Sequence, residues 1–427
     1  MTFRIAYLFY DAPNYCAGPR INALRLLPEL ARRGHDVTAL IGYHQACQAK
    51  AVLESQGVRV HAVQWPRFVE DQIAWLYRCL EAEQPDVFVP NISVSGCYAA
   101  RYLREGGVPT IAGHLSDDAF NWGMAERFCK LGDDWAVSGL FCMGTELARI
   151  VRSWNPERTK IVEIPHGVPL PSETADPTGP IRLVFAGRLE ERQKRIGETA
   201  KSIVNVLKRD PAATAKIIGD GSQRSTLEAH IKQSGVADRI ELTGFVTPDR
   251  VHDAMLTGNV LILLSDFEGV PGAVMDGMAC GLVPVCLDLP GGLRELVVGE
   301  ETGLLVTDRG PSFQNAILRL GRDVELRLRL SANARKHIET GFSLRVAADR
   351  WERLFCELSM DAGSRRPVHF PSRPVLPPPY PGIVREDQRR PSRYARAYQR
   401  CAGLRRRVAR WVSHRCSGYP EQAKKTP

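Results

Sequence analysis

Short apolar segments alternate with amphipathic ones along most of the chain, and this alternation limits the folds open to it. In the first half, apolar segments at 4–10 and 37–41 flank residues 20–33, whose apolar positions recur at helical spacing up to a glycine. Further buried strands are expected at 58–63, 86–89, 109–112 and 139–143. Strands that alternate with helices form a parallel sheet covered on both faces. The first half is therefore predicted to be one doubly wound α/β domain.

A second alternating series begins at 181–186, after a segment at 169–180 rich in Pro, Ser, Thr and Asp. That composition is typical of an interdomain linker. The sequence thus predicts an N-terminal Rossmann-like domain at 1–168 and a C-terminal one at 181–343, and an amphipathic helix at 344–359 is expected to close the folded body. Two such domains in tandem place a ligand cleft between the carboxyl ends of their sheets.

The net charge of +9 is concentrated at the C-terminus. From residue 360 onward sixteen basic residues face four acidic ones, a net +12, which leaves −3 for the rest of the chain. A nucleic-acid enzyme spreads positive charge over its folded surface, so no nucleic-acid partner is expected. The proline-dense and then Arg-rich composition predicts a disordered tail at 360–427. The tail either only aids solubility or attaches the protein to an anionic membrane surface.

The apolar runs and the cysteines indicate the cellular compartment in which the protein is expected. The best apolar run, 260–264, is far shorter than a membrane span. The first ten residues contain too short an apolar stretch for a signal peptide, and no cleavage site follows. The eleven cysteines are odd in number, scattered, and without a Cys-x-x-Cys pair. These features predict a cytoplasmic protein that reaches the inner face of the membrane only through its tail.

Two cations follow the apolar strand at 181–186. Gly187 lets the chain turn, and Arg188 and Lys194 come at the carboxyl end of that strand. A guanidinium fork and an ammonium group both suit a diphosphate, although such residues in a polar loop are also common on any surface.

Glycines end the next strands of the second half. Gly219 and Gly221 follow one strand, and Gly244 with Phe245 ends another. Glycine allows main-chain atoms to approach a flat base closely, and it also serves in ordinary tight turns.

The most specific cluster spans 265–281, directly after an apolar strand and into a helix. The N–H groups of Gly272, Ala273 and Val274 are expected to be unpaired at the helix start and to point toward an anion. Glu268 precedes the helix and Asp276 lies about one turn inside it, so both carboxylates can face one ligand. Acidic residues near a helix start are also favoured by the helix dipole alone.

Taken together, these clusters resemble the donor half of retaining glycosyltransferases of the GT-B fold, family 4 type. The matching residues between 181 and 306 are Gly187-Arg188 with Lys194, Gly219-Asp220-Gly221, Gly244-Phe245, 265–281, Pro284-Val285, Gly291-Gly292 with Glu295, and 301–306. The N-terminal half resembles the family more weakly, through the loop at Gly18 and the segments 34–37, 111–114 and 165–168.

The resemblance implies a role for each site residue. Arg188 and Lys194 would neutralise the donor diphosphate, assisted by the helix start at 272–274. Glu268 would hold hydroxyls of the transferred sugar. Asp276 stands where the family has Glu, whose carboxylate binds the nucleotide ribose, and its side chain is one methylene shorter.

The resemblance also implies contacts from the first domain. His114 would approach the sugar, although a lone histidine is otherwise a core or surface residue. Gly18, Gly219, Gly221, Gly244 and Phe245 complete the expected donor-binding set.

The implied reaction moves a sugar from a nucleotide-diphosphate sugar to a glycan, lipid-linked or other acceptor, with retention (hexosyltransferase-like, EC 2.4), as in polysaccharide biosynthesis. The chain has no Asp-x-Asp pair, so no metal and no cofactor is expected. The alternatives are another enzyme of this fold, such as an epimerase or phosphorylase, and a catalytically degenerate subunit that binds a donor or glycan.

Overall fold

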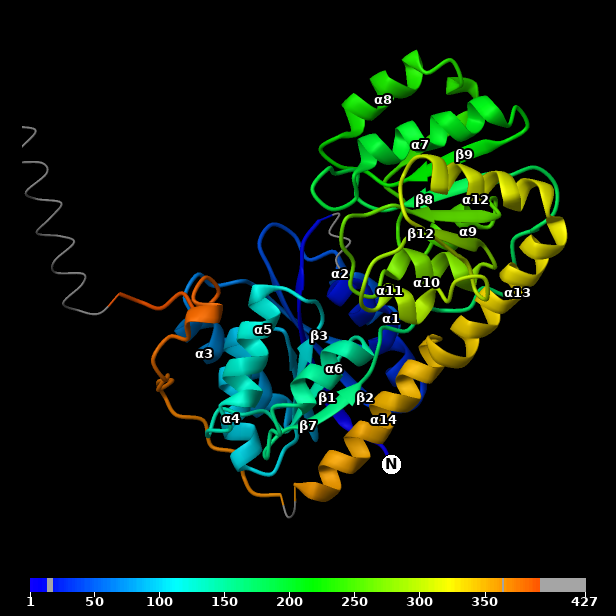
Figure 1. Ribbon diagram of the computed structural model, residues 1–427. Coiled ribbons are helices and arrows are strands. Elements are labelled where there is room, and N and C mark those ends of the chain that lie inside the picture. Colours follow the sequence, from blue (N-terminus) through cyan, green and yellow to red (C-terminus); the bar gives the residue numbers. More distant parts are fainter. Residues whose placement is uncertain (14–17, 363–364, 392–427) are drawn as a thin grey trace, which may run out of the picture.

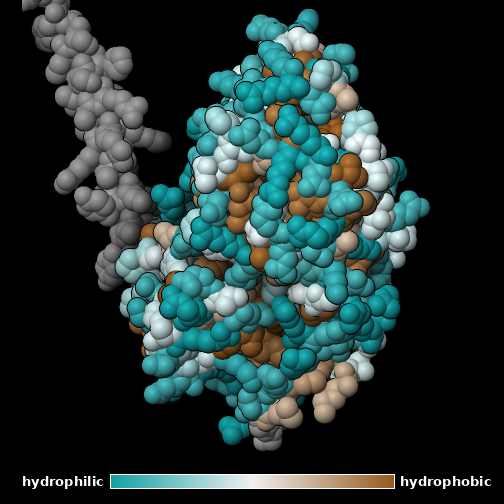
Figure 2. All heavy atoms as spheres, turned by 45° about the vertical axis from the view of Figure 1, so that its right-hand side comes forward, coloured by the Kyte–Doolittle hydropathy of each residue, from teal (hydrophilic) through white to brown (hydrophobic). Residues whose placement is uncertain are grey.

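The chain folds into two α/β domains joined side by side, as the computed structural model shows for residues 1–13, 18–362 and 365–391 (Figure 1). Within these residues, no helix is both long and apolar enough to cross a bilayer. The face in Figure 2 is mainly hydrophilic, and the hydrophobic residues visible there lie in patches framed by hydrophilic ones.

The first domain is built on a seven-stranded sheet in the order β3-β2-β1-β4-β5-β6-β7, with every neighbouring pair parallel. Its strands are β1 (Arg4–Asp11), β2 (Asp36–Tyr43), β3 (Arg59–Gln64), β4 (Val87–Asn91), β5 (Thr110–His114), β6 (Gly139–Cys142) and β7 (Lys160–Glu163). Its helices are α1 (Gly18–Arg32), α2 (Ala49–Glu54), α3 (Val69–Glu83), α4 (Val94–Glu105), α5 (Ala119–Ala125), the π-helical turn η1 (Glu126–Lys130) and α6 (Thr145–Arg152).

Strand β1 shows why this sheet is buried on both faces. Ile5 and Tyr7 belong to one hydrophobic cluster, and Ala6 and Leu8 to the other. Successive side chains of a strand point to opposite faces, so a continuous apolar run needs a layer of helices on each side. The predicted doubly wound arrangement is confirmed. The edge strand β7 was not predicted, because its four residues are exposed or half-buried and lack a long apolar run.

The second domain has a six-stranded parallel sheet in the order β10-β9-β8-β11-β12-β13. Its strands are β8 (Arg182–Ala186), β9 (Thr214–Ile218), β10 (Ile240–Gly244), β11 (Val260–Leu263), β12 (Val283–Leu287) and β13 (Leu304–Val306). Its helices are α7 (Ile196–Arg209), α8 (Arg224–Gln233), the 3-10 turn η2 (Ala237–Arg239), α9 (Val251–Met255), α10 (Gly272–Ala279), α11 (Leu293–Leu296), α12 (Pro311–Arg322) and α13 (Val324–Gly341).

The chain passes between the domains at two adjacent points. Val168, on the way out, donates its N–H to Phe342 and accepts from Leu344, on the way back. Helix α14 (Leu344–Asp361) then returns to the first domain, where it packs against α1 (Figure 1). Trp351 is almost fully buried there, so the helix predicted to close the body joins the two domains.

Residues 365–391, which we call the strap, differ from the predicted disordered tail. They run from the end of α14 along α4 and past α3 (Figure 1). Phe370 stacks on Tyr77 with ring centroids 4.5 Å apart, and Ile383, in the 3-10 turn η3 (Pro381–Ile383), is fully buried. Proline excludes helix and sheet but leaves the side chains between prolines free to fill a groove. The rest of the predicted tail, 392–427, lies outside the described residues.

Candidate functional site

The carboxyl edges of the two sheets face each other, which is where ligands bind in open α/β folds. Gly269, in the loop after β11, lies against the end of β5, since a Cβ added to it would be 3.5 Å from the carbonyl oxygen of Leu115. Glu295 of α11 accepts the backbone N–H of Thr145, at the start of α6, at 2.8 Å. Loops that follow strands in both domains therefore meet.

Lys194 and Glu268 form the centre of the candidate site. They lie in the loops after β8 and β11, two adjacent strands, and Lys194 Nζ is 2.6 Å from Glu268 Oε1. The side chains of Lys194 and Glu268 are only 12% and 6% exposed. The predicted cation and the predicted sugar-binding carboxylate are thus brought together.

Gln193 is a site residue that the sequence did not reveal. Its side-chain amide donates to the Phe267 carbonyl at 3.0 Å and to Glu268 Oε2 at 3.3 Å, and it accepts from Arg188 at 3.1 Å. Arg188 itself is exposed and also pairs with Glu190 at 3.0 Å. Gln193 therefore links the exposed cation to the buried carboxylate; its position directly before Lys194 was the available signal.

The glycine loops after β8, β9 and β10 pack closely on one another, and their donor-binding role stays a prediction. A Cβ on Gly219 would lie 1.9 Å from the Gly187 carbonyl oxygen, and one on Gly221 would lie 2.4 Å from that of Leu189. Gly219 also donates its N–H to the Gly244 carbonyl at 2.9 Å. Because glycine has no side chain, these loops can approach one another closely. The packing alone requires glycine at these positions, whether or not a nucleotide base also binds there.

Phe245 follows β10 directly. Its ring is 38% exposed at the same edge of the sheet. An exposed ring there is free to stack on a planar ligand.

The start of α10 offers fewer free donors than predicted. The N–H of Val274 donates to the Pro271 carbonyl at 3.0 Å, so the expectation that it is unpaired is wrong. Pro271 is the N-cap residue of α10, and the Pro271 carbonyl accepts this hydrogen bond to form a tight first turn. Gly272 is exposed and Ala273 is half-buried, and the described residues give their N–H groups no backbone partner. Two donors therefore remain for an anion.

Asp276 faces the first domain. Its Oδ1 lies 2.9 Å from Arg25 of α1 and 2.8 Å from His252 Nε2. Burial opposes ionisation, yet Arg25 and His252 lower the pKa of Asp276, so the carboxylate is charged. Both its oxygens are engaged with Arg25. A bound ribose would therefore have to share or displace this interdomain ion pair, and the ribose role stays a prediction.

Gly18 and His166 lie beside this ion pair. Gly18 opens α1, and a Cβ on it would be 3.4 Å from the His166 ring. Burial and the charge of Arg25 lower the pKa of His166 to about 3, so the ring is neutral at neutral pH. The predicted contribution of the Gly18 loop is thus placed where α1 meets the second domain.

His114 is the last residue of β5, one position before Leu115, but it is fully buried. Its ring packs edge-on against Trp122, with centroids 4.4 Å apart, and neither ring nitrogen has a hydrogen-bond partner among the described residues. Burial lowers the pKa of His114 to about 4. A neutral ring with two unpaired nitrogens is costly, and a ligand hydroxyl would satisfy one of them. The active-site role of His114 stays a prediction, because Trp122 covers the ring.

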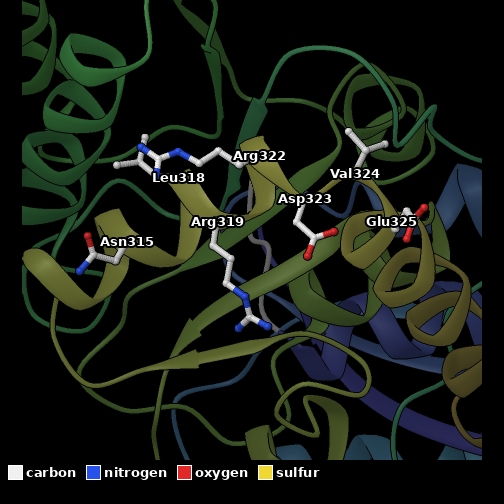
Figure 3. A pocket seen from close by; sticks show the side chains of 7 residues that line it. All are labelled: Asn315, Leu318, Arg319, Arg322, Asp323, Val324 and Glu325. Carbon is white, nitrogen blue, oxygen red and sulfur yellow. The ribbon is translucent and has the colours of Figure 1, made fainter.

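A pocket of about 670 Å³ at the junction of α12 and α13 is not part of this site. Figure 3 shows that its polar side chains, such as Arg319, Arg322 and Asp323, point in different directions and do not converge. Arg319 is already paired with Glu300. This pocket is a surface depression without candidate chemistry.

Two known families match the two halves of the chain. Residues 17–167 match the family "Glycosyl transferase 4-like domain", and residues 170–337 match "Glycosyl transferases group 1". Residues 17–167 and 170–337 are thus similar to these two glycosyltransferase families, and the rest of the chain lies outside both matches. The expected recognition is confirmed at this level.

Individual relatives agree with the two domain matches. The chain is 37% identical over 100 residues to the 2-deoxystreptamine N-acetyl-D-glucosaminyltransferase of Streptomyces fradiae, covering 23% of each protein. It is 25% identical over 310 residues to the UDP-Gal:alpha-D-GlcNAc-diphosphoundecaprenol alpha-1,3-galactosyltransferase of Escherichia coli, covering 66% of this chain and 78% of the relative. The first alignment thus spans less than a quarter of that relative.

Solved structures show the fold. The Anabaena HepE structure in complex with UDP superposes with a TM-score of 0.65 at 15% identity, covering 83% of this chain and 100% of HepE. The glycosyltransferase domains of this chain thus have the GT-B arrangement of two facing Rossmann-like domains.

Proposed function

We propose that this chain is a glycosyltransferase that moves a sugar from a nucleotide-diphosphate sugar to a hydroxyl of a glycan or lipid-linked acceptor. The observation that carries the proposal is the Lys194–Glu268 pair, held by Gln193 at the edge where the two sheets meet. Support for the substrates comes from relatives, since HepE structures hold UDP and UDP-glucose and the Escherichia coli relative is a UDP-Gal-dependent galactosyltransferase.

In this reaction the bond between the anomeric carbon and the diphosphate oxygen breaks, and negative charge develops on the leaving diphosphate. Arg188, Lys194 and the N–H groups at the start of α10 would stabilise that charge. Glu268, which is ion-paired with Lys194, would accept hydrogen bonds from hydroxyls of the transferred sugar. The acceptor hydroxyl would attack the anomeric carbon and pass its proton to the departing diphosphate oxygen. Retention of configuration belongs to the proposal and rests on the family resemblance.

UDP release from UDP-glucose is the first test. The wild-type chain should release UDP slowly to water and faster when a saccharide acceptor is added, whereas an epimerase would release none. Glu268→Gln should lower the rate by about 10²-fold, because a neutral amide binds the sugar hydroxyls less strongly. Asp276→Asn should have a smaller effect on the rate, since Asp276 is proposed to bind the spectator ribose rather than the transferred sugar. No UDP release with any nucleotide sugar, or a more severe defect in Asp276→Asn, would contradict these assignments.

Metal independence is the second test. Two cationic side chains and two backbone donors would balance the diphosphate charge without an ion, and the chain has no Asp-x-Asp pair of the kind that holds a metal ion on a diphosphate. Turnover in excess EDTA should equal turnover without it. Activity lost in EDTA and restored by magnesium or manganese would overturn this part of the proposal.

Membrane attachment is also proposed, through the basic stretch at 392–427. Its arginines would meet lipid phosphates and its aromatic residues would lie at the interface of the inner leaflet, as the composition suggests. Sedimentation with anionic vesicles is the measurement that tests it.

A further inference from the structure

A second cavity, of about 620 Å³, opens at the carboxyl edge of the first sheet. Residues at the ends of β1 and β2, residues after β3 and β4, and residues of the strap line it. Pro19 and Arg20 of α1 also border it, and Arg25 on the same helix contacts Asp276 in the second domain. Helix α1 thus borders the cavity and also contacts the second domain, which holds the candidate donor site.

Aromatic rings form part of the cavity lining. Trp65 packs on Gly42 of β2, since a Cβ on that glycine would be only 2.2 Å from the ring, and Trp65 and Trp75 form an edge-to-face pair at 6.0 Å between centroids. Tyr10 and His44 form an edge-to-face pair at 5.3 Å. Rigid aromatic faces of this kind pack against the C–H groups of a sugar ring, and nearby polar groups then bind the hydroxyls.

Asn91 supplies an independent sign of a missing ligand. It is 2% exposed, has a left-handed backbone conformation (φ 54°), and its Oδ1 has no hydrogen-bond partner among the described residues. A buried carbonyl oxygen without a partner is rare and costly in a native protein. Asn91 lines the cavity, and its Oδ1 lies near Gly113 of β5, where a Cβ would be 3.0 Å from that oxygen.

The strap places Arg385 and Glu386 at the cavity by anchoring the chain on both sides of them. Before them, Ile383 is fully buried. After them, the buried carboxylate of Asp387 accepts the Tyr98 hydroxyl at 3.0 Å, and the Gln388 carbonyl accepts the N–H of Val69, at the start of α3, at 2.9 Å.

The two residues at the cavity remain exposed between these anchors. A guanidinium fork and a carboxylate are both well suited to bind vicinal hydroxyls.

We propose that this cavity binds the acceptor saccharide and that the strap, an extension beyond the two glycosyltransferase domains, supplies one of its walls through Arg385 and Glu386. The identification of the bound saccharide as the acceptor rests on the proposed function. The binding of a saccharide to the cavity does not depend on the donor site.

Saturation-transfer NMR tests the binding directly, with methyl α-D-glucoside, methyl α-D-galactoside and N,N′-diacetylchitobiose as probes and no nucleotide present. At least one probe should bind the full-length wild-type chain. Arg385→Ala and Glu386→Ala should each weaken that binding about tenfold, because each removes charge-assisted hydrogen bonds. Arg373→Ala, an exposed arginine of the strap that does not line the cavity, is the matched control and should bind as the wild type does.

The outcomes separate this inference from the proposed function. Failure of every probe to bind the wild type, or equal binding by Arg385→Ala, Glu386→Ala and Arg373→Ala, would overturn the strap wall. Saccharide binding that the two variants weaken, in a chain that never releases UDP, would uphold the cavity and refute the glycosyltransferase proposal. In an active chain, the same variants should raise the KM for the acceptor, whereas Arg373→Ala should not.

Discussion

Lys194→Ala is expected to reduce sugar transfer about 10³-fold, because one of the two cations that face the departing diphosphate is lost. The same variant should unfold at a lower temperature. Lys194 pairs with a Glu268 that is 6% exposed, so its removal leaves a buried carboxylate held only by Gln193 and costs roughly 3 kcal/mol of folding stability. The measurements are UDP release with an acceptor and a thermal unfolding curve.

Arg188→Ala is the matched comparison. Its side chain is 59% exposed, so transfer should fall while the melting temperature stays near that of the wild type. The double variant Lys194→Ala/Glu268→Gln should recover part of the stability lost in Lys194→Ala, because no buried charge is left unpaired, and should remain inactive. Near-normal turnover in Lys194→Ala would refute the site. An unchanged melting temperature would show that the ion pair does not stabilise the domain.

Because Arg188 is exposed and Lys194 is largely buried, only the Arg188 substitution is expected to leave stability unchanged. Sequence reasoning placed Lys194 and Glu268 together correctly, because each follows a buried strand of a parallel sheet and loops after such strands share one edge. Which of the two cations is buried was not readable, since that depends on Gln193 and the packing of the two loops.

The Arg25–Asp276 pair shows a second limit. Its members are 251 positions apart and belong to different domains. The pair forms only when α1 and α10 are brought together, which depends on how the two domains are oriented. A lone arginine in an amphipathic helix gives no local sign of this partner.

The strap was predicted least well, for a related reason. Composition correctly indicated that 365–391 forms neither a regular helix nor a strand beyond one short turn. Whether such a segment is ordered depends on a matching groove elsewhere. Here Gly382 crosses Gly123 of α5 so closely that a Cβ on Gly382 would be 2.7 Å from the Gly123 Cα. Only the folded first domain provides that groove.

Removal of the strap should therefore destabilise the first domain. A chain that ends at Ala362 loses the stacking of Phe370 on Tyr77 and the fully buried side chain of Ile383. It also loses the Asp387 carboxylate that accepts the hydroxyl of Tyr98. The free energy of this apolar burial exceeds the cost in conformational entropy of ordering the strap. We therefore expect the free energy of unfolding to fall by about 3 kcal/mol and Tm to fall by roughly 10 °C. A chain ended after Pro391 keeps these contacts and should melt as the full-length protein does.

Point substitutions make the same test without shortening the chain. Ile383→Asp places a charge at a position that is 0% exposed and should reproduce most of the loss, whereas Val384→Asp, at a position that is 55% exposed, should leave Tm within about 1 °C of the wild type. Equal melting of the Ala362-ended and Pro391-ended chains would show that the strap is not part of the folded body. The Pro391-ended chain separates the two parts of the C-terminus, because it should stay folded and bind saccharide yet no longer sediment with anionic vesicles. If it still sediments, the vesicle contact belongs to the folded domains rather than to 392–427.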